Sequence, residues 1–204
     1  MIAGSNIPGC NNPARNNPVR ADRVRNRTRL LQAAKALFAE GGPDCSLERI
    51  ARHAGLGVAT LYRHFPTRQD LFEAVYQNEV EQLVALATSV EPAPPVAALR
   101  QWLHAFVEFV AAKKGMSAAL AIVAQPSAPM TVNAHGRLVA ALAPLLQRAA
   151  AEGGVRHDIT AEDLLRTAVG LCYTHDKPGW QGNVCRLVDV FIDGMRRGAD
   201  GAQT

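Results

Sequence analysis

The stretch that decides the fold is ERIARHAGLGVATLYRHFPTRQDLF, which runs from Glu48 to Phe72. It holds two short apolar-periodic segments joined at Gly55, a residue that tolerates the left-handed backbone of tight turns. A helix of about two turns is not stable alone in water, because nucleation is costly and stability must come from packing. The pattern therefore predicts a helix-turn-helix, in which the first helix braces the second for a DNA major groove.

Helical periodicity continues on both sides of this unit. An apolar pattern starts at Arg23 and ends at the helix-breaking Gly41-Gly42-Pro43. Ser46 is the expected N-cap of the next helix. After a proline, Thr67 is expected to cap a longer helix that reaches about Val90.

The remainder of the chain shows only helical patterns. Apolar residues recur at helical spacing in four further segments, within residues 96–110, 138–149, 164–172 and 184–195. No alternating strand pattern and no internal repeat interrupts them. The predicted fold class is all-α, with an N-terminal three-helix headpiece followed by a helical domain.

Positive charge is concentrated in the N-terminal third. Residues 1–71 hold 11 Lys and Arg against 5 Asp and Glu, whereas residues 72–204 hold 11 against 13. The net charge is therefore +6 in the first part and −2 in the second, although the whole chain is only +4. This asymmetry indicates that the N-terminal part meets a polyanion and that the rest has another task.

Several classes of protein are disfavoured. No apolar run reaches the roughly 18 residues that span a bilayer, and the first residues lack the apolar core of a signal peptide, so a cytoplasmic protein without membrane contact is expected. The four cysteines form no CxxC pair, which argues against a zinc ribbon or a disulfide framework. No phosphate-binding glycine loop, G-x-S-x-G or H-E-x-x-H motif is present, so we expect no enzyme and no cofactor.

The second short helix offers a polar face to DNA. Thr60, Tyr62, His64 and the following Arg68 are of types that contact phosphates, whereas Val58 and Arg63 are expected near base edges. Tyr62 and Arg63 could instead be an ordinary surface aromatic and a solvated charge. The full predicted DNA-binding set is Ser46, Gly57, Val58, Ala59, Thr60, Tyr62, Arg63, His64 and Arg68.

The same region resembles the TetR family of transcriptional regulators. The residues that carry the resemblance are Ala33, Ala34, Leu37, Phe38, Ile50, Ala51, Ala54, Gly55, Thr60, Leu61, Tyr62, Phe65, Leu71 and Phe72. The chain departs from the family at Gly57 and Ala59, where Ser and Gly are usual, so the operator sequence does not carry over. Arg68 replaces the usual Lys and keeps its charge.

This resemblance implies a homodimeric, ligand-responsive repressor that a small molecule releases from a palindromic double-stranded DNA operator. The expected division is a flexible basic arm over 1–22, a DNA-binding domain over 23–70, a helical regulatory and dimerisation domain over 71–198 and a tail over 199–204. The alternative is a helical small-molecule-binding protein or enzyme that retains the headpiece fold without binding an operator. Effector identity, target genes and repression as opposed to activation stay open.

Three further sets of residues are candidates for function. The expected ligand pocket is lined by Trp102, Phe106, Phe109, Met116, Met130 and Cys172, although residues of these types at helical spacing are usually core. Dimerisation through the last two helices is expected to use Leu165, Val169, Val184, Leu187, Val188, Phe191, Ile192 and Met195. Cys172, His175 and Asp176 have a spacing that suits metal ligands, but packing explains them better and no metal site is expected.

Overall fold

The computed structural model describes residues 18–39, 46–120, 128–174, 177 and 179–196. Within these ranges the chain forms eight α-helices and no strand, so the all-α prediction is confirmed. The helices are α1 (Pro18–Ala39), α2 (Leu47–His53), α3 (Val58–His64), α4 (Arg68–Ser89), α5 (Pro95–Leu120), α6 (Ala128–Ala151), α7 (Ala161–Tyr173) and α8 (Trp180–Gly194).

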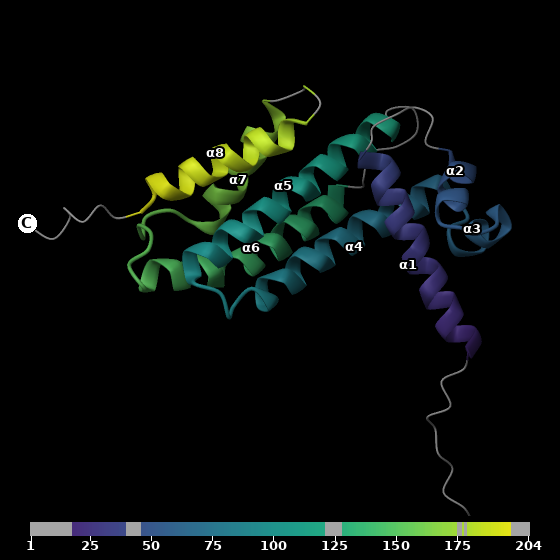
Figure 1. Cartoon of the computed structure of the whole chain (residues 1–204), viewed down its shortest axis with the longest axis horizontal. Helices are drawn as coiled ribbons and strands as arrows, with labels where there is room; N and C mark the ends of the chain where they lie inside the picture. The colour runs from purple at the N-terminus through teal and green to yellow at the C-terminus, as the bar shows by residue number, and fades with distance from the viewer. Residues whose placement is uncertain (1–17, 40–45, 121–127, 175–176, 178, 197–204) are drawn as a thin grey trace, which may run out of the picture.

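The short helices α2 and α3 lie at one end of the molecule, where α1 crosses the start of α4 (Figure 1). The long helix α4 runs from this headpiece into a bundle formed with α5, α6, α7 and α8. Helix α5 is central, because it packs against α1, α4, α6, α7 and α8. The headpiece and the bundle therefore share α4 and are joined again where α1 packs on α5.

The first helix starts earlier than its apolar pattern predicts. Helix α1 begins at Pro18, so residues 18–22, which were expected in a flexible arm, are helical. Proline suits the first position of a helix, and the Arg and Ala residues that follow it have high helix propensity. Residues 1–17 and the predicted tail over 199–204 lie outside the described ranges.

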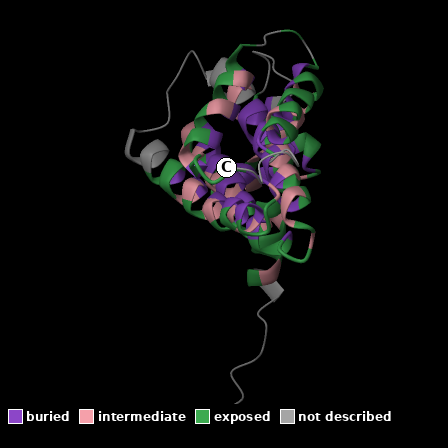
Figure 2. Cartoon of the chain, turned by 90° about the vertical axis from the view of Figure 1, so that its left-hand side faces the viewer, coloured by how far each residue is buried: buried purple, intermediate pink, exposed green. Residues whose placement is uncertain are grey.

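Buried side chains form one continuous apolar cluster through the headpiece and the bundle. Figure 2 shows the buried faces of the helices turned toward one another and the exposed faces turned outward. Trp102 of α5 is fully buried, and its indole Nε1 donates a hydrogen bond of 2.9 Å to the carbonyl of Leu83 on α4. This bond satisfies the one polar atom of a large apolar side chain and ties α5 to α4.

Two polar features secure α4. The Thr67 hydroxyl accepts a hydrogen bond from the Asp70 N–H while the Asp70 carboxylate accepts one from the Thr67 N–H, which confirms Thr67 as the predicted cap. Further along, the Lys35 ammonium of α1 lies 2.5 Å from the Glu79 carboxylate of α4, whose side chain is almost completely buried. The ion pair links the headpiece helix α1 to the middle of α4.

Among the helices in the described ranges, none combines the length and the apolar character needed to span a bilayer.

Candidate nucleic-acid interface and apolar cavity

The turn between α2 and α3 depends on Gly55. Its φ is +64°, and the turn is closed by hydrogen bonds from the Gly55 N–H to the Arg52 carbonyl at 3.0 Å and from the Leu56 N–H to the Ala51 carbonyl at 2.9 Å. This is a Schellman C-cap, which favours glycine at the left-handed position. A Cβ on Gly55 would lie 2.7 Å from the Arg29 guanidinium of α1, which is the end of a flexible side chain and can move aside, so the backbone conformation is what favours a glycine there.

The two short helices begin differently. The Ser46 hydroxyl accepts a hydrogen bond of 3.2 Å from the Arg49 N–H, which confirms Ser46 as the N-cap of α2. The N-cap of α3 is Gly57, which has no side chain to offer. Helix α3 is held instead by Leu61 and Phe65, both of which are buried in the headpiece core.

The outer face of α3 is accessible. Tyr62 is 45% exposed, and Arg63 is also exposed. The other members of the predicted set are exposed at Ser46, Gly57 and Ala59 and half-buried at Val58, Thr60, His64 and Arg68. This exposure is compatible with a face that enters a groove, and the individual contacts to DNA stay predictions.

Arginines of α1 add positive charge beside this face. The Arg27 guanidinium lies 4.7 Å from the centroid of the Phe65 ring, which brings α1 next to the end of α3. Burial, together with the charges of Arg23 and Arg27, lowers the pKa of His64 and favours its neutral form at neutral pH. These arginines are not in the predicted DNA-binding set, although their spacing of four residues places both on one side of a helix.

A cavity of about 550 Å³ lies between α4, α5, α6 and α7. Its lining residues are Tyr76, Phe106, Phe109, Val110, Lys113, His135, Leu138, Leu165, Arg166, Val169, Gly170 and Tyr173. The volume falls within the range of pockets that hold small organic ligands. Because Tyr76 belongs to α4, the cavity has a wall on the helix that continues from the headpiece.

The predicted pocket set is only partly at this cavity. Phe106 and Phe109 line it, and Trp102 stacks behind Phe106 with ring centroids 5.8 Å apart. Cys172 is buried and is not among the lining residues, and burial raises the pKa of its thiol to about 12. The side chains of Met116 and Met130 lie outside what the structure describes.

The cavity combines an aromatic wall with a cation. The Phe109 ring centroid lies 5.6 Å from that of Tyr76 and 5.9 Å from that of Phe106. The Lys113 ammonium lies 5.9 Å from the Tyr76 ring centroid, and burial lowers the pKa of this lysine. Burial also raises the pKa of Tyr76, with a smaller contribution from Tyr173. Tyr76 and Lys113 were missed in the sequence because they are far apart along the chain.

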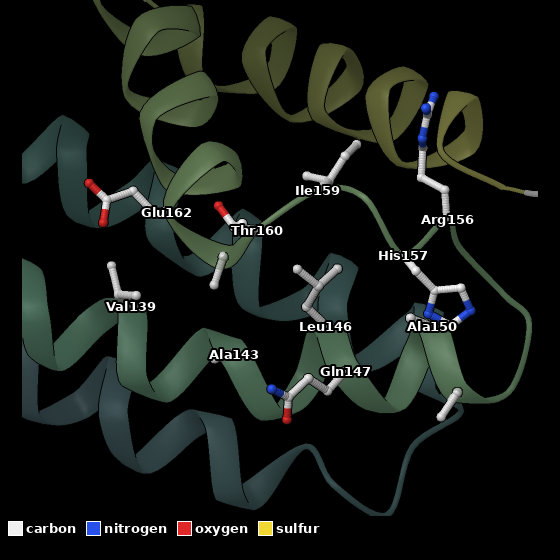
Figure 3. A pocket seen from close by; sticks show the side chains of 12 residues that line it. Val139, Ala143, Leu146, Gln147, Ala150, Arg156, His157, Ile159, Thr160 and Glu162 are labelled. Carbon is white, nitrogen blue, oxygen red and sulfur yellow. The ribbon is translucent and has the colours of Figure 1, made fainter.

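A second cavity, of about 500 Å³, lies between α6 and the connection to α7 (Figure 3). Val139 and Leu146 of α6 face Ile159 and Thr160 across it, while Arg156 points away from α6. None of its lining residues belongs to α4 or to the headpiece. The aromatic cavity is lined by α4 itself through Tyr76 and is therefore the more direct candidate for an effector site.

The predicted dimer residues divide into buried and exposed members. The buried side chains pack inside the protomer, mostly because α8 lies against α5, and are therefore not available to a second copy; they are Leu165, Val184, Val188, Ile192 and Met195. Val169 and Leu187 are 37% and 40% exposed, and Phe191 is half-buried. Two apolar residues outside the predicted set, Tyr173 and Val190, are more exposed, at 53% and 68%.

The possible metal ligands can be placed only in part. Cys172 is buried in α7, whereas His175 and Asp176 lie outside the described residues. In the part of the chain that the structure describes, no three His, Cys, Asp or Glu side chains are grouped so that they could hold a metal ion.

Comparison with known proteins gives two family matches. Residues 30–75 match the model for bacterial regulatory proteins of the tetR family, and residues 94–197 match the model for the C-terminal domain of SbtR-like transcriptional regulators. The first match includes the turn between α2 and α3 and ends one residue before Tyr76 of α4. The second match begins after α4 and includes α5, α6, α7 and α8.

Solved structures and curated relatives agree with this. The crystal structure of the TetR transcriptional regulator SCO0520 from Streptomyces coelicolor is 40% identical, covers 85% of this chain and 99% of its own, and has a TM-score of 0.76. A TetR regulatory protein from Mycobacterium vanbaalenii is 33% identical over 88% of this chain and 100% of its own, with a TM-score of 0.70. The HTH-type transcriptional regulator SAB2452 of Staphylococcus aureus is 39% identical over 64 residues, which are 31% of this chain and 35% of that protein.

Proposed function

The chain belongs to the TetR family of transcriptional regulators, and we propose that it is a repressor that a small molecule releases from its DNA operator. One observation carries this proposal. Helix α4 begins directly after the exposed helix α3, and its Tyr76 lines the aromatic cavity of about 550 Å³. A single rigid element therefore connects a candidate ligand site with the candidate DNA reader.

On the DNA side, α3 is the recognition helix. Val58 and Arg63 read base edges, because an arginine can grip guanine and an aliphatic side chain can meet a thymine methyl group. Thr60, Tyr62, His64 and Arg68 hold phosphates. The arginines of α1 beside the end of α3 add to the attraction of the phosphate backbone.

The repressor is a homodimer in this proposal, because two recognition helices must enter successive major grooves about 34 Å apart. The exposed apolar residues of α7 and α8 support a two-fold interface on that side of the bundle. They are Val169, Tyr173, Leu187, Val190 and the half-buried Phe191. Packing of α7 and α8 against their copies would form a four-helix interface.

Release works through α4. A ligand that fills the cavity presses on Tyr76, and a shift of α4 changes the separation of the two recognition helices. The Lys35–Glu79 ion pair lies three residues further along α4 and transmits the shift to α1. Ligand and operator then weaken each other's binding by the same factor, since coupling between sites is reciprocal. Such a regulator acts on chromosomal DNA in the cytoplasm.

A gel shift with DNA from upstream of the protein's own gene tests the proposal. We expect sequence-selective retardation that survives competitor DNA, and its loss when an effector found by thermal-shift screening is added. An effector that binds equally well with and without operator DNA would exclude the α4 mechanism. Ligand binding without any selective retardation would instead favour a helical binding protein or enzyme that retains the headpiece fold.

A further inference from the structure

Lys113 is an unusual residue for the wall of an apolar cavity. It is half-buried on α5 among Tyr76, Phe109 and Val110, and its ammonium contacts the face of the Tyr76 ring. Among the described residues it has neither an ion-pair nor a hydrogen-bond partner. A cation that has lost part of its water and has gained only a ring contact lies in an unfavourable environment until an anion joins it.

The neighbouring cations are already occupied. Lys114 donates a hydrogen bond of 3.0 Å to the Cys172 carbonyl and lies over the Trp180 ring, so it points away toward α7 and α8. At the border of the cavity, Arg166 and His135 both contact the Glu162 carboxylate, at 2.6 Å and 3.4 Å. Lys113 is therefore the lining cation whose charge the described protein leaves unbalanced.

The lining of the cavity offers no carboxylate to balance it. Between Glu108 and Glu152 the chain contains no acidic residue, and this stretch includes the end of α5, the connection to α6 and the whole of α6. None of the residues that line the cavity is Asp or Glu. The lining that α5 and α6 contribute around Lys113 is therefore free of carboxylates, since Glu108 of α5 is exposed and does not line the cavity.

We propose that the cavity binds an organic acid, with an aromatic or aliphatic body against Phe106, Phe109 and Leu138 and its carboxylate paired with Lys113. This rests on the proposed effector role of the cavity and specifies the chemical class of the effector. The carboxylate would take the position that no protein acid occupies and would stabilise the charged form of the lysine. A cationic ligand would meet Lys113 without a compensating acid, and a neutral one would leave it unpaired.

The test compares acids with their neutral amides on the full-length protein. Three probes of different shape are 1-naphthaleneacetate, 4-phenylbutyrate and decanoate, each titrated by calorimetry beside its own primary amide. We expect at least one acid to bind about ten- to a hundredfold more tightly than its amide, the range for a hydrogen bond to a charged group. This comparison uses the wild-type protein alone and does not depend on the folding of any variant.

Variants then assign the preference to one side chain. Lys113→Met should reduce the ratio of acid to amide affinity to about one, and Lys113→Arg should keep part of the preference. Arg137→Met is the matched control, because Arg137 belongs to the same acid-free stretch but does not line the cavity, and it should keep the full preference. The proposal is overturned if no acid exceeds its amide in the wild type, or if the preference survives in Lys113→Met.

Adding the same compounds to the gel shift separates this inference from the proposed function. An acid preference that depends on Lys113, without any release of DNA, supports the ligand class and contradicts the regulatory role. Release of DNA by a compound whose affinity is unaffected by Lys113→Met supports the regulatory role and contradicts the ligand class.

Discussion

Lys35→Met would leave the Glu79 carboxylate buried without its ion-pair partner. The two groups are 2.5 Å apart, and the Glu79 side chain is only 7% exposed, whereas that of Lys35 is 40% exposed. Removing one partner of a fully buried pair costs about 3–5 kcal/mol, because an unpaired charge stays inside the protein. Since Lys35 is partly in water, water can reach the carboxylate once the lysine is shortened, and we expect roughly half of that cost, about 2 kcal/mol.

For a chain of 204 residues this loss corresponds to a fall in melting temperature of about 4–8 °C. A double-mutant cycle in urea isolates the pair from the packing of the lysine stem. Lys35→Met on a Glu79→Leu background should cost less than about 0.5 kcal/mol, since no buried charge then remains. All four proteins must be compared at one concentration, because the proposed dimerisation would make stability depend on concentration. Equal costs of Lys35→Met on both backgrounds would refute the reasoning.

Three other substitutions test local features. Gly55→Ala should lower the free energy of unfolding by about 1 kcal/mol in a thermal melt, because the φ of +64° at this position disfavours a side chain. Gly57→Ser should be neutral or slightly stabilising in the same melt, because its hydroxyl can cap α3 and its Cβ meets no other atom within 4 Å. Arg63→Ala should cost about 1–3 kcal/mol of binding free energy on the operator selected from random DNA and much less on a scrambled sequence. Equal losses of affinity for both DNAs in the gel shift would show that Arg63 does not contact bases. Val190→Glu should give a folded monomer in sedimentation, whereas Val188→Glu should unfold the protomer because Val188 is buried. A full dimer of Val190→Glu would exclude this face of α8 from the dimer interface.

Local signals made the headpiece predictable. Caps and turns depend on residues within one or two turns of each other, and so Ser46, Gly55 and Thr67 have the conformations that their sequence neighbours suggest. The start of α1 shows the limit of this reasoning. An apolar pattern reveals only the part of a helix that packs, whereas α1 also includes residues 18–22, which precede that pattern.

The dimer face could not be read in the same way. Val184, Val188 and Ile192 lie on one side of α8, and this spacing correctly predicts that the side is buried. Periodicity does not reveal which element packs against the buried side of a helix, and in this protein α8 packs against α5 of the same chain. The exposed apolar residues Leu187 and Val190 of α8 are weaker signals in the sequence, because isolated apolar residues at a surface are common.

The cavity is harder still to predict, because a cavity is a place where packing is incomplete and that depends on how four helices meet. Lys113 is the residue that could have drawn attention to it. A methionine of similar length would suit the apolar wall between Tyr76 and Val110 and would not have to give up water, so Lys113→Met should melt no lower than the wild type. A charged side chain in an otherwise apolar wall breaks the usual packing pattern, and such exceptions generally occur where function requires them. If the substitution stabilises the protein and also abolishes the preference for acids, the cost of burying Lys113 is offset only when an anion is bound.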